Sequence, residues 1–410
     1  MARGHEVQVI TGFPNYPGGH LYPGYRLRPI LREVIDGVPV VRLPLYPSHD
    51  RSAFRRVLNY ASFGVSAALV APFVARPADV VYVYHPPGTI GLPALALRYL
   101  RRMPLVIDIQ DLWPDTLAAT GMVRSERLLG LVDRWMRLVY GAAGRIVVLS
   151  PGFKQALVNR GVSETKIEVI YNWTEEADVG GGVTTGTASV LEQDCFNVVF
   201  AGTAGTAQGL SSVVDAAGLI QDRHPDVRIV LVGGGVERDE LKSQVRRMGL
   251  SNIVFLPRVP RSQVGGILSA ADVLLVHLRN DPLFQITIPG KTQAYFATGR
   301  PILMAVAGDA ARLVERAEAG ISCTPGDPVS IADAVDMLYE MTPAQREEMG
   351  RSGRRFYNEE LSFDIGVGQF ERCLLSVTSR NRRPRLSLLT TQRAAKMVET
   401  RDTHDGSSDE

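Results

Sequence analysis

Residues that could hold a phosphate gather in the second half of the chain. One turn, between an apolar run and a helical stretch, reads Gly202-Thr-Ala-Gly-Thr-Ala-Gln-Gly209. Glycines at such a turn let backbone N–H groups approach a phosphate, and the N-terminus of the next helix adds positive partial charge. The spacing differs from the dinucleotide fingerprint G-x-G-x-x-G, so a tight turn without a ligand is an equally good interpretation. The candidate phosphate-binding residues are Gly202, Thr203, Gly205, Gln208 and Gly209.

Two further turns repeat this chemistry. Gly233-Gly-Gly235 follows the apolar run 228–232 and would lie at the same edge of a parallel sheet. Ile286-Thr-Ile-Pro-Gly-Lys-Thr292 places Lys291 and Thr292 in the first turn of a predicted helix. It lacks the glycine-rich run of a P-loop, but a cation, a hydroxyl and free N–H groups at one helix start suit a diphosphate. Gly233, Gly290 and Gln293 join the candidates, and a bare turn and simple helix initiation are the alternatives.

In the first half, polar side chains follow two apolar runs. His85-Pro-Pro-Gly88 comes directly after the run 80–84, where a histidine held by prolines could exchange a proton or a hydrogen bond. A structural histidine is an equally good interpretation. Asp108-Ile-Gln-Asp111-Leu-Trp-Pro-Asp115 follows the next run, and Asp111 is its candidate for contacting an acceptor hydroxyl. Asp115 is the alternative helix cap, and Trp113 suits the core or, less well, a sugar face.

Two isolated residues complete the candidates. Asp281, on a loop, could accept hydrogen bonds from sugar hydroxyls or be a surface residue of the turn Asn280-Asp-Pro. Arg258, after the apolar run 253–255, could be a second cation, and a surface arginine is an equally good interpretation. No histidine pair and no Ser-His-Asp spacing indicates a metal site or a hydrolase triad, and we expect neither a metal nor a resident cofactor.

The elements that must position these residues alternate along the chain. Short apolar runs alternate with helical stretches, which predicts α/β domains whose parallel sheets are covered on both faces. The alternation stops in an acidic, then Gly- and Thr-rich segment with the composition of a linker. Two doubly wound halves would place a ligand in the cleft between them, at the carboxyl ends of the strands. The expected divisions are domains 1–173 and 195–350, a linker 174–194, a helical segment 351–378 and a disordered tail 379–410.

Composition excludes several classes of protein. The 410 residues include 45 Lys+Arg and 43 Asp+Glu, and the resulting net charge of +2 argues against a nucleic-acid-binding protein. Cys195, Cys323 and Cys373 are too far apart in sequence for a disulfide framework or a four-ligand zinc site, which fits a cytoplasmic setting. Met1 leads into a strand-like run, Val7-Gln-Val-Ile10, without the pattern of a signal peptide.

One segment, residues 54–74, could touch a membrane because it is nearly uncharged and apolar. Asn59 and Pro72 interrupt it, which disfavours a complete span. Its composition favours a buried or surface-docked helix. The alternative is an interfacial helix with basic residues at lipid headgroups. Those residues would be Arg51, Arg55 and Arg56.

Several short motifs follow one another in a fixed order from residue 4 to about residue 376. They include Gly4-His-Glu-Val-Gln-Val-Ile10, Asp111-Leu-Trp-Pro114, Val148-Leu-Ser-Pro-Gly-Phe153, Ile170-Tyr-Asn-Trp173, Ala207-Gln-Gly-Leu210, Asp281-Pro-Leu-Phe284 and Ile288-Pro-Gly-Lys-Thr-Gln-Ala-Tyr295. In content and order they resemble the WbuB-type group of family-4 glycosyltransferases. The resemblance implies a GT-B fold, with two Rossmann-like domains facing across a cleft and final helices, within 351–378, that cross back to the first domain.

The resemblance also implies an activity. Such enzymes move a sugar, with retention and without a metal, from a UDP-sugar to a polyprenyl-diphosphate-linked glycan in O-antigen, colanic-acid-like or capsule synthesis. The sugar would be an N-acetylated deoxyhexose such as L-fucosamine. The second domain would hold the donor, with the phosphate-binding candidates, Arg258 and Asp281 as donor-binding residues. His85, Asp111 and Lys291 would be the catalytic residues. The protein would be cytoplasmic, with peripheral contact between residues 51–75 and the inner membrane.

Three departures from the family pattern stand out. A first βα unit, about 25–30 residues by the usual size of such units, is missing ahead of Gly4, and a mis-assigned start at Met1 is the simpler explanation. The wider family's glutamate pair falls on Ile286 and Ala294. The basic residue common before Ala-Gln-Gly is Thr206, which shifts the role of binding the diphosphate to Lys291.

Three rival interpretations remain open. A truncated, non-catalytic nucleotide-sugar-binding protein would share the fold. An NAD(P)-dependent dehydrogenase lacks support because G-x-G-x-x-G is absent. A UDP-sugar epimerase would turn over the donor without an acceptor.

Overall fold

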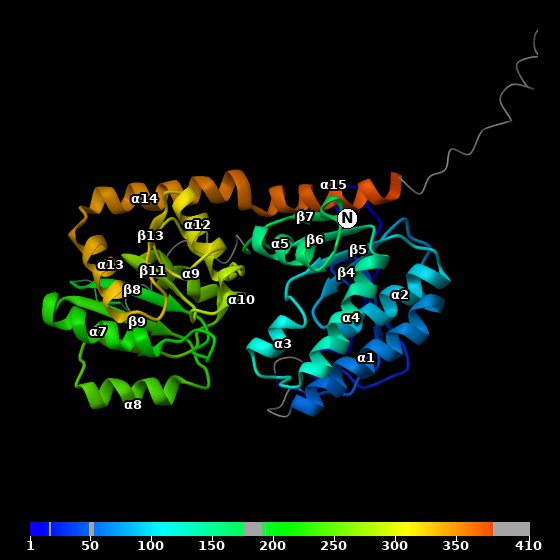
Figure 1. The fold of residues 1–410 in the computed structure, drawn as a ribbon, viewed down its shortest axis with the longest axis horizontal. Helices are drawn as coiled ribbons and strands as arrows, with labels where there is room; N and C mark the ends of the chain where they lie inside the picture. The colour runs from blue at the N-terminus through cyan, green and yellow to red at the C-terminus, as the bar shows by residue number, and fades with distance from the viewer. Residues whose placement is uncertain (16–17, 49–52, 176–190, 193, 380–410) are drawn as a thin grey trace, which may run out of the picture.

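A computed structural model of the chain describes residues 1–15, 18–48, 53–175, 191–192 and 194–379. Two α/β domains lie side by side, and a long helical segment runs along one side of both (Figure 1). Most of the predicted linker, 174–194, and all but one residue of the predicted tail, 379–410, lie outside the described residues.

The first domain contains two sheets. One has the order β1-β3-β2, with β1 parallel and β2 antiparallel to β3; its strands are β1 (Val9–Gly12), β2 (Leu31–Ile35) and β3 (Val38–Leu43). The other is parallel in the order β4-β5-β6-β7; its strands are β4 (Val81–His85), β5 (Leu105–Ile109), β6 (Arg145–Val148) and β7 (Ile167–Val169). Ile10 of β1 and Val81 of β4 pack on one cluster of helical and loop residues, so this cluster joins the two sheets.

Helices connect these strands and cover them. They are α1 (Ala53–Val74), η1 (Gly88–Ile90), α2 (Gly91–Leu100), α3 (Asp115–Ala119), α4 (Glu126–Ala142), α5 (Pro151–Asn159) and η2 (Glu164–Lys166). Local sequence sets the start of α5: the Ser150 hydroxyl accepts a hydrogen bond from the Phe153 N–H, and Pro151 occupies the first turn. The same motif therefore fixes where β6 ends and the helix begins.

The second domain is one parallel sheet of six strands in the order β10-β9-β8-β11-β12-β13. Its strands are β8 (Phe196–Ala201), β9 (Val227–Val232), β10 (Ile253–Leu256), β11 (Val273–His277), β12 (Ile302–Ala305) and β13 (Gly320–Ser322). Its helices are α7 (Ser211–Arg223), α8 (Arg238–Met248), α9 (Arg261–Ala270), α10 (Pro282–Gln285), α11 (Lys291–Thr298), α12 (Asp309–Arg316) and α13 (Pro328–Glu340). The strand order reverses between β8 and β11, and in open α/β sheets ligands bind at such a point.

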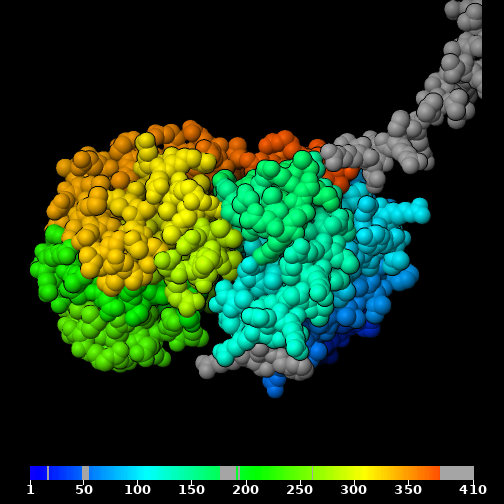
Figure 2. Space-filling view, in the orientation of Figure 1, coloured from blue at the N-terminus to red at the C-terminus, as the bar shows by residue number. Residues whose placement is uncertain are grey.

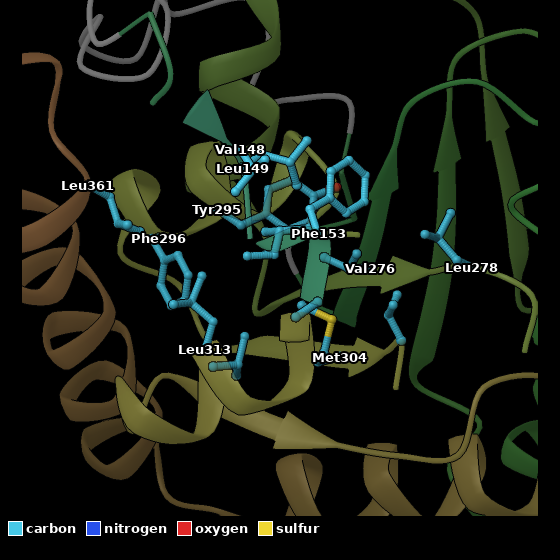
Figure 3. Close-up of a cluster of buried hydrophobic side chains, with 14 of the residues drawn as sticks. Val148, Leu149, Phe153, Val276, Leu278, Tyr295, Phe296, Met304, Leu313 and Leu361 are labelled. Atoms are coloured by element: carbon cyan, nitrogen blue, oxygen red, sulfur yellow. The ribbon is translucent and has the colours of Figure 1, made fainter. Parts of the chain in front are cut away.

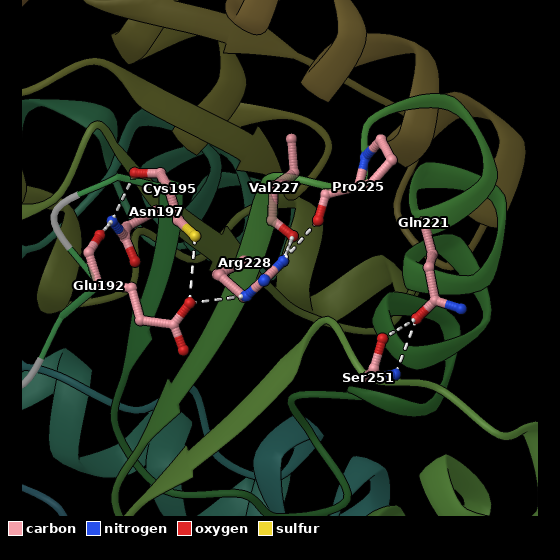
Figure 4. A network of polar contacts seen from close by, with 8 residues as sticks. All are labelled: Glu192, Cys195, Asn197, Gln221, Pro225, Val227, Arg228 and Ser251. Atoms are coloured by element: carbon pink, nitrogen blue, oxygen red, sulfur yellow. Dashed lines mark hydrogen bonds and ion pairs between the residues drawn. The ribbon is translucent and has the colours of Figure 1, made fainter.

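A polar network fixes the start of the second domain (Figure 4). The Glu192 carboxylate accepts hydrogen bonds from the Cys195 thiol and the Arg228 guanidinium, both at 3.1 Å. The Asn197 side-chain amide donates to the carbonyls of Glu192 and Cys195. These contacts hold the chain that leads into β8 against the start of β9. The positions of β8 and β9 in turn determine where the glycine turns at their carboxyl ends lie.

The last helices cross between the domains (Figure 1). They are α14 (Pro343–Phe356), the π-helical turn η4 (Tyr357–Leu361) and α15 (Phe363–Ser379). Cys373 and Val377 of α15 complete an apolar cluster with Val106, Val147 and Ile170 of the first domain. The chain therefore returns to the first domain after it has built the second.

Helix α1 is the one described helix long and apolar enough to cross a membrane, by length and composition. Only 28% of its apolar stretch, within Arg55–Val74, is buried. It packs on η1 and α2, where Gly64 lies close to Thr89 of η1 and Leu92 of α2. The helix is thus docked on the domain surface, one of the two placements that composition allowed. The predicted α/β architecture with parallel sheets is confirmed.

Candidate functional site

The two glycine turns of the second domain lie against each other at the carboxyl ends of β8 and β9. The Gly202 N–H donates to the Val232 carbonyl and the Ala204 N–H to the Gly234 carbonyl, at 2.9 and 2.8 Å. A Cβ on Gly233 would lie 2.1 Å from the Gly202 carbonyl oxygen, and the φ of Gly233 is +131°. Glycine at 233 is therefore required by the close approach of the two turns.

The first turn is closed by its own glutamine. The Gln208 side-chain oxygen accepts a hydrogen bond from the Gly205 N–H at 3.2 Å. Gly209 has a φ of +57°, and α7 begins two residues later. Gly202 and Thr203 are exposed. The turn is thus internally braced and open on the side that a ligand would approach.

Lys291 lies directly over this turn. Its Nζ is 3.4 Å from the centroid of the Phe200 ring and 2.8 Å from the position that a Cβ on Gly202 would occupy. The ammonium is buried and has no hydrogen-bond partner, although the residue as a whole is partly exposed. Burial lowers the pKa of Lys291 to about 7. A buried cation that lies over an aromatic ring but has no hydrogen-bond acceptor, beside a glycine turn, suits an anionic ligand.

The other candidates of the second domain follow strands or begin helices of the same sheet. Thr292 and Gln293 are buried; the Thr292 hydroxyl has no partner, and the Gln293 side-chain nitrogen, suitably oriented, donates to the carbonyls of Pro289 and Gly290. One oxygen of Asp281 accepts from the Leu283 N–H, so Asp281 caps α10. Arg258 is exposed beyond β10, and Gly290 is exposed at the start of α11. Their roles toward a ligand stay predictions.

On the first domain, His85 ends β4 and lies beside Trp113. The ring centroids are 5.9 Å apart in an edge-on arrangement, and the histidine is 1% exposed. Neither ring nitrogen of His85 forms a hydrogen bond of ordinary geometry, although backbone groups of His85 itself and of Asp111 lie close enough to act on the ring. Burial lowers the pKa of His85 to about 4, so the ring is neutral at pH 7.

The carboxylates of the next loop have separate roles. Asp108 accepts hydrogen bonds from the Tyr82 hydroxyl and the Gln110 amide, so its role is structural. Asp111 is half-buried, and burial raises its pKa. The sequence offered Asp115 as a helix cap, but its side chain does not cap α3 and instead forms an ion pair with Arg160. Asp111 is therefore the carboxylate of this loop that stays available to a substrate among the described residues.

The carboxyl ends of the two sheets meet at a close contact between domains. The Ser150 hydroxyl donates to the Ile286 carbonyl at 2.5 Å, and the Gly152 N–H donates to the Asp309 carboxylate at 2.6 Å. Phe153, which is 1% exposed, belongs to a buried apolar cluster that includes Val276 and Tyr295 of the second domain (Figure 3). The domains touch along this contact and are separated by a narrow groove beyond it (Figure 2).

Two residues at the end of β11 escaped the sequence analysis. His277 is buried and bonds to the carbonyl of Gln208 in the glycine turn, and the Arg279 N–H donates to the carbonyl of Ala207. The signal available in the sequence was their place at the end of an apolar run, not their spacing. No direct contact joins His85 or Asp111 to Lys291 among the described residues. Among the residues that the structure describes, no group of three or more His, Cys, Asp or Glu side chains could hold a metal ion.

Comparison with known proteins follows the same division of the chain. Residues 1–173 match a glycosyl transferase 4-like domain, and residues 195–341 match the glycosyl transferases group 1 family. The chain is 24% identical to the probable glycosyltransferase WbjE of Pseudomonas aeruginosa, over 75% of this chain and 77% of WbjE. It is 26% identical to the putative colanic acid biosynthesis glycosyl transferase WcaI of Escherichia coli (73% and 74% covered). It is 29% identical to the D-rhamnosyltransferase WbpZ of Pseudomonas aeruginosa (74% and 75% covered).

Solved structures share the fold. A sucrose-phosphate synthase from Thermosynechococcus elongatus superposes with a TM-score of 0.65 at 18% identity, covering 92% of this chain and 90% of the synthase. HepE of Anabaena, solved with UDP and glucose, gives 0.63 at 18% identity, with 83% and 87% covered. At these identities the likeness is one of fold. Together, the two matched domains and the shared GT-B fold show that the chain belongs to the glycosyltransferases.

Proposed function

We propose that this glycosyltransferase moves a sugar from a UDP-sugar to a lipid-linked glycan during synthesis of a surface polysaccharide. The observation that carries the proposal is the buried Lys291 ammonium, which has no hydrogen-bond partner and lies over the glycine turn at 202–209. A diphosphate supplies the counter-charge and acceptor oxygens that this ammonium lacks. The names of WcaI and WbpZ, a colanic acid enzyme and a rhamnosyltransferase, support the polysaccharide setting, and the UDP bound to HepE supports the nucleotide.

The site would act mainly on the leaving group. As the bond between the anomeric carbon and the phosphate oxygen breaks, negative charge grows on the diphosphate and positive charge on the sugar. Lys291, the N–H groups of the turn and the N-termini of α7 and α11 would stabilise the diphosphate without a metal. The acceptor hydroxyl would attack from the same face, with retention, and its proton would pass to the departing phosphate oxygen.

The first domain would position the acceptor and the sugar. His85 is neutral at pH 7, so its ring carries one N–H donor and one acceptor nitrogen. Asp111 can accept a hydrogen bond from the attacking hydroxyl. The Phe153 contact holds the two domains against each other, which would help to exclude water from the donor.

The finer assignments follow from the WbuB-type motifs. We propose an N-acetylated deoxyhexose such as L-fucosamine as the sugar and a polyprenyl-diphosphate-linked glycan as the acceptor. The enzyme would work at the cytoplasmic face of the inner membrane. Helix α1 supports this location because Val65, Leu69 and Phe73 project outward, with Phe73 86% exposed.

Release of UDP from a panel of UDP-N-acetylated sugars, with and without a polyprenyl-diphosphate-sugar, tests the proposal. We expect release only when the acceptor is present, and a loss of about 10²–10³-fold in kcat for Lys291→Ala. Lys242→Ala is the matched control. Lys242 also lies over an aromatic ring of the same domain, that of Phe255, but it belongs to the middle of α8 and not to the glycine turn at 202–209.

Other outcomes would point to the rival functions. Tight donor binding without release would leave a non-catalytic nucleotide-sugar-binding protein. Conversion of the donor without any acceptor would indicate an epimerase. Equal activity of the wild type and Lys291→Ala would contradict the role proposed for the buried Lys291 ammonium in stabilising the diphosphate.

A further inference from the structure

A diphosphate needs more positive charge than the glycine turns and Lys291 provide. Neither 202–209 nor 233–235 contains a basic residue. Lys291 is the cation over the first turn, and burial holds its pKa near 7 when no anion is bound. A pyrophosphate group carries two or more negative charges, so a second cation near the turn would strengthen binding. This reasoning rests on the proposed function.

Arg279 lies at the opposite end of the turn from Lys291. Its N–H donates to the Ala207 carbonyl at 3.0 Å, and its Cγ is 2.6 Å from the position that a Cβ on Gly209 would occupy. The side chain is exposed. Among the described residues, its guanidinium forms no hydrogen bond or ion pair. Lys291 over Gly202 and Arg279 over Gly209 therefore flank the turn at both ends.

The neighbouring arginines are less suitable. Arg238 is already engaged, because its guanidinium donates to the carbonyls of Gly233 and Leu256. Arg258 follows β10, the edge strand, which is separated from β8 by β9. Arg279 follows β11, which pairs directly with β8. Of these three arginines, Arg279 combines contact with the turn and an uncommitted charge.

His277 fixes the backbone that carries Arg279. The Gly326 N–H donates to Nε2 of His277 at 3.3 Å, so Nε2 is the acceptor and Nδ1 bears the proton. Nδ1 in turn donates to the Gln208 carbonyl at 2.6 Å, and the Ser212 hydroxyl lies 3.1 Å from Nε2. One buried ring thus ties β11 to the glycine turn, to the first turn of α7 and to the loop before α13.

We infer that Arg279 is a second cation for the donor diphosphate and that His277 is the positioning residue that holds Arg279 and the glycine turn in register. Arg279 and Lys291 bind the diphosphate from the two ends of the turn. Because both cations flank the glycine turn and would act on the phosphates, the pair favours a diphosphate over a monophosphate.

Calorimetric binding of UDP and UMP to the full chain tests Arg279. We expect Arg279→Gln to weaken UDP about 10- to 100-fold, the usual effect of losing a charge-assisted hydrogen bond, and UMP by much less. Arg279→Lys should recover part of the affinity. Adding Thr206→Lys to Arg279→Gln, which places a cation within the turn itself, should also recover part of it. Arg247→Gln, an exposed arginine on α8, is the charge-loss control.

Each alternative outcome identifies what has failed. If the wild type binds UDP and Arg279→Gln keeps the same UDP affinity and the same UDP-to-UMP ratio, the inference on Arg279 is overturned while the proposed function stands. If the wild type binds neither UDP nor UDP-sugars, the proposed function fails, and the inference fails with it.

Substitutions at His277 test its positioning role. His277→Asn keeps a donor near the Nδ1 position, whereas His277→Leu removes both hydrogen-bonding atoms. We expect His277→Leu to raise the KM for the donor about 10-fold with little change in kcat, and His277→Asn to restore most of this loss. A fall in Tm for His277→Leu with an unchanged KM would show a purely structural histidine and overturn this part of the inference.

Discussion

At the scale of single residues, the site combines groups whose ordinary chemistry has been changed by burial. Lys291 is the clearest case, because an ammonium without a hydrogen-bond partner is costly to bury. The cost falls when an anion binds, so a ligand-free site of this kind favours its ligand. His85 shows the same feature in a neutral ring. Both residues were identified from sequence by their places after a strand and at a helix start.

The affinity for UDP should depend on pH through Lys291. Its pKa is about 7 without ligand, and only the charged form attracts the diphosphate. Above pH 7 the free protein loses this proton, so binding must recover it, and we expect UDP affinity to fall from pH 7 to pH 9 with proton uptake on binding. Calorimetry in two buffers of different ionisation enthalpy measures the uptake. In Lys291→Met the slope should disappear; a slope that persists there would assign the pH dependence to another group.

The residues that sequence reasoning missed were invisible for a physical reason. His277 is the last residue of a buried strand, and a histidine in such a run is usually structural. Arg279 has no motif of its own. The roles inferred for them arise from the pairing of β11 with β8, which brings together two strand ends that are distant in sequence. Strand order cannot be read from the alternation of helices and strands alone.

At the scale of elements, the glycine turns work because one backbone approaches another. Gly233 faces the carbonyl of Gly202, whereas a Cβ on the adjacent Gly234 would meet nothing within 4 Å. A side chain at position 234 would therefore be tolerated, whereas a side chain at position 233 would clash with the first turn.

Gly233→Ala should displace the first turn and reduce UDP binding by at least about 10-fold, with a loss of stability of about 1–3 kcal/mol from the clash and the positive φ. Gly234→Ala is the matched control and should change neither property much. Binding is measured by calorimetry and stability by denaturant unfolding. Equal affinities of the two variants would contradict the role given to the close approach.

Helix α1 should bind anionic membranes through its outward face. We expect Leu69→Glu combined with Phe73→Glu to reduce sedimentation with phosphatidylglycerol-containing vesicles several-fold while UDP binding is kept, because charges in the headgroup region oppose insertion. Val34→Glu, at a residue 68% exposed on β2 of the same domain, is the control for an added surface charge. Vesicle binding that is the same for all three proteins would exclude α1 as the membrane contact.

The positions of individual strands could be predicted from the sequence more fully than the way in which the strands pair and the domains contact each other. Continuous apolar runs such as 229–232 and 273–276 are strands in the structure because both faces of a parallel sheet are covered. The split of the first domain into two sheets could not be anticipated, since β1 and β4 differ in their pairing and not in their local pattern. The contact between Ser150 and Ile286 joins residues far apart in sequence, and no local signal marks it.

At the scale of the whole molecule, the two domains are held in register by the contact around Gly152. A Cβ there would lie 2.4 Å from the Ile286 side chain and 2.7 Å from the Asp309 carboxylate. Any larger residue at 152 must separate the domains or deform α5.

Gly152→Ala should therefore lower kcat at least about 10-fold, because small misplacements between reacting groups are costly, while UDP binding by the second domain changes little. Gly130→Ala, on α4 with open space around it, is the control. Steady-state kinetics and small-angle X-ray scattering measure the effect and any increase in size. A normal kcat for Gly152→Ala would show that the contact does not set the catalytic geometry.

The return of α15 to the first domain also has a consequence for biosynthesis. Val106, Val147 and Ile170 form an apolar face that Cys373 and Val377 complete. A ribosome adds about 5–20 residues per second, so this face stays uncovered for about 10–40 s while the second domain is made. The nascent first domain is therefore a natural client for chaperones that shield apolar surface during translation. Its core becomes complete only after the second domain has been synthesised.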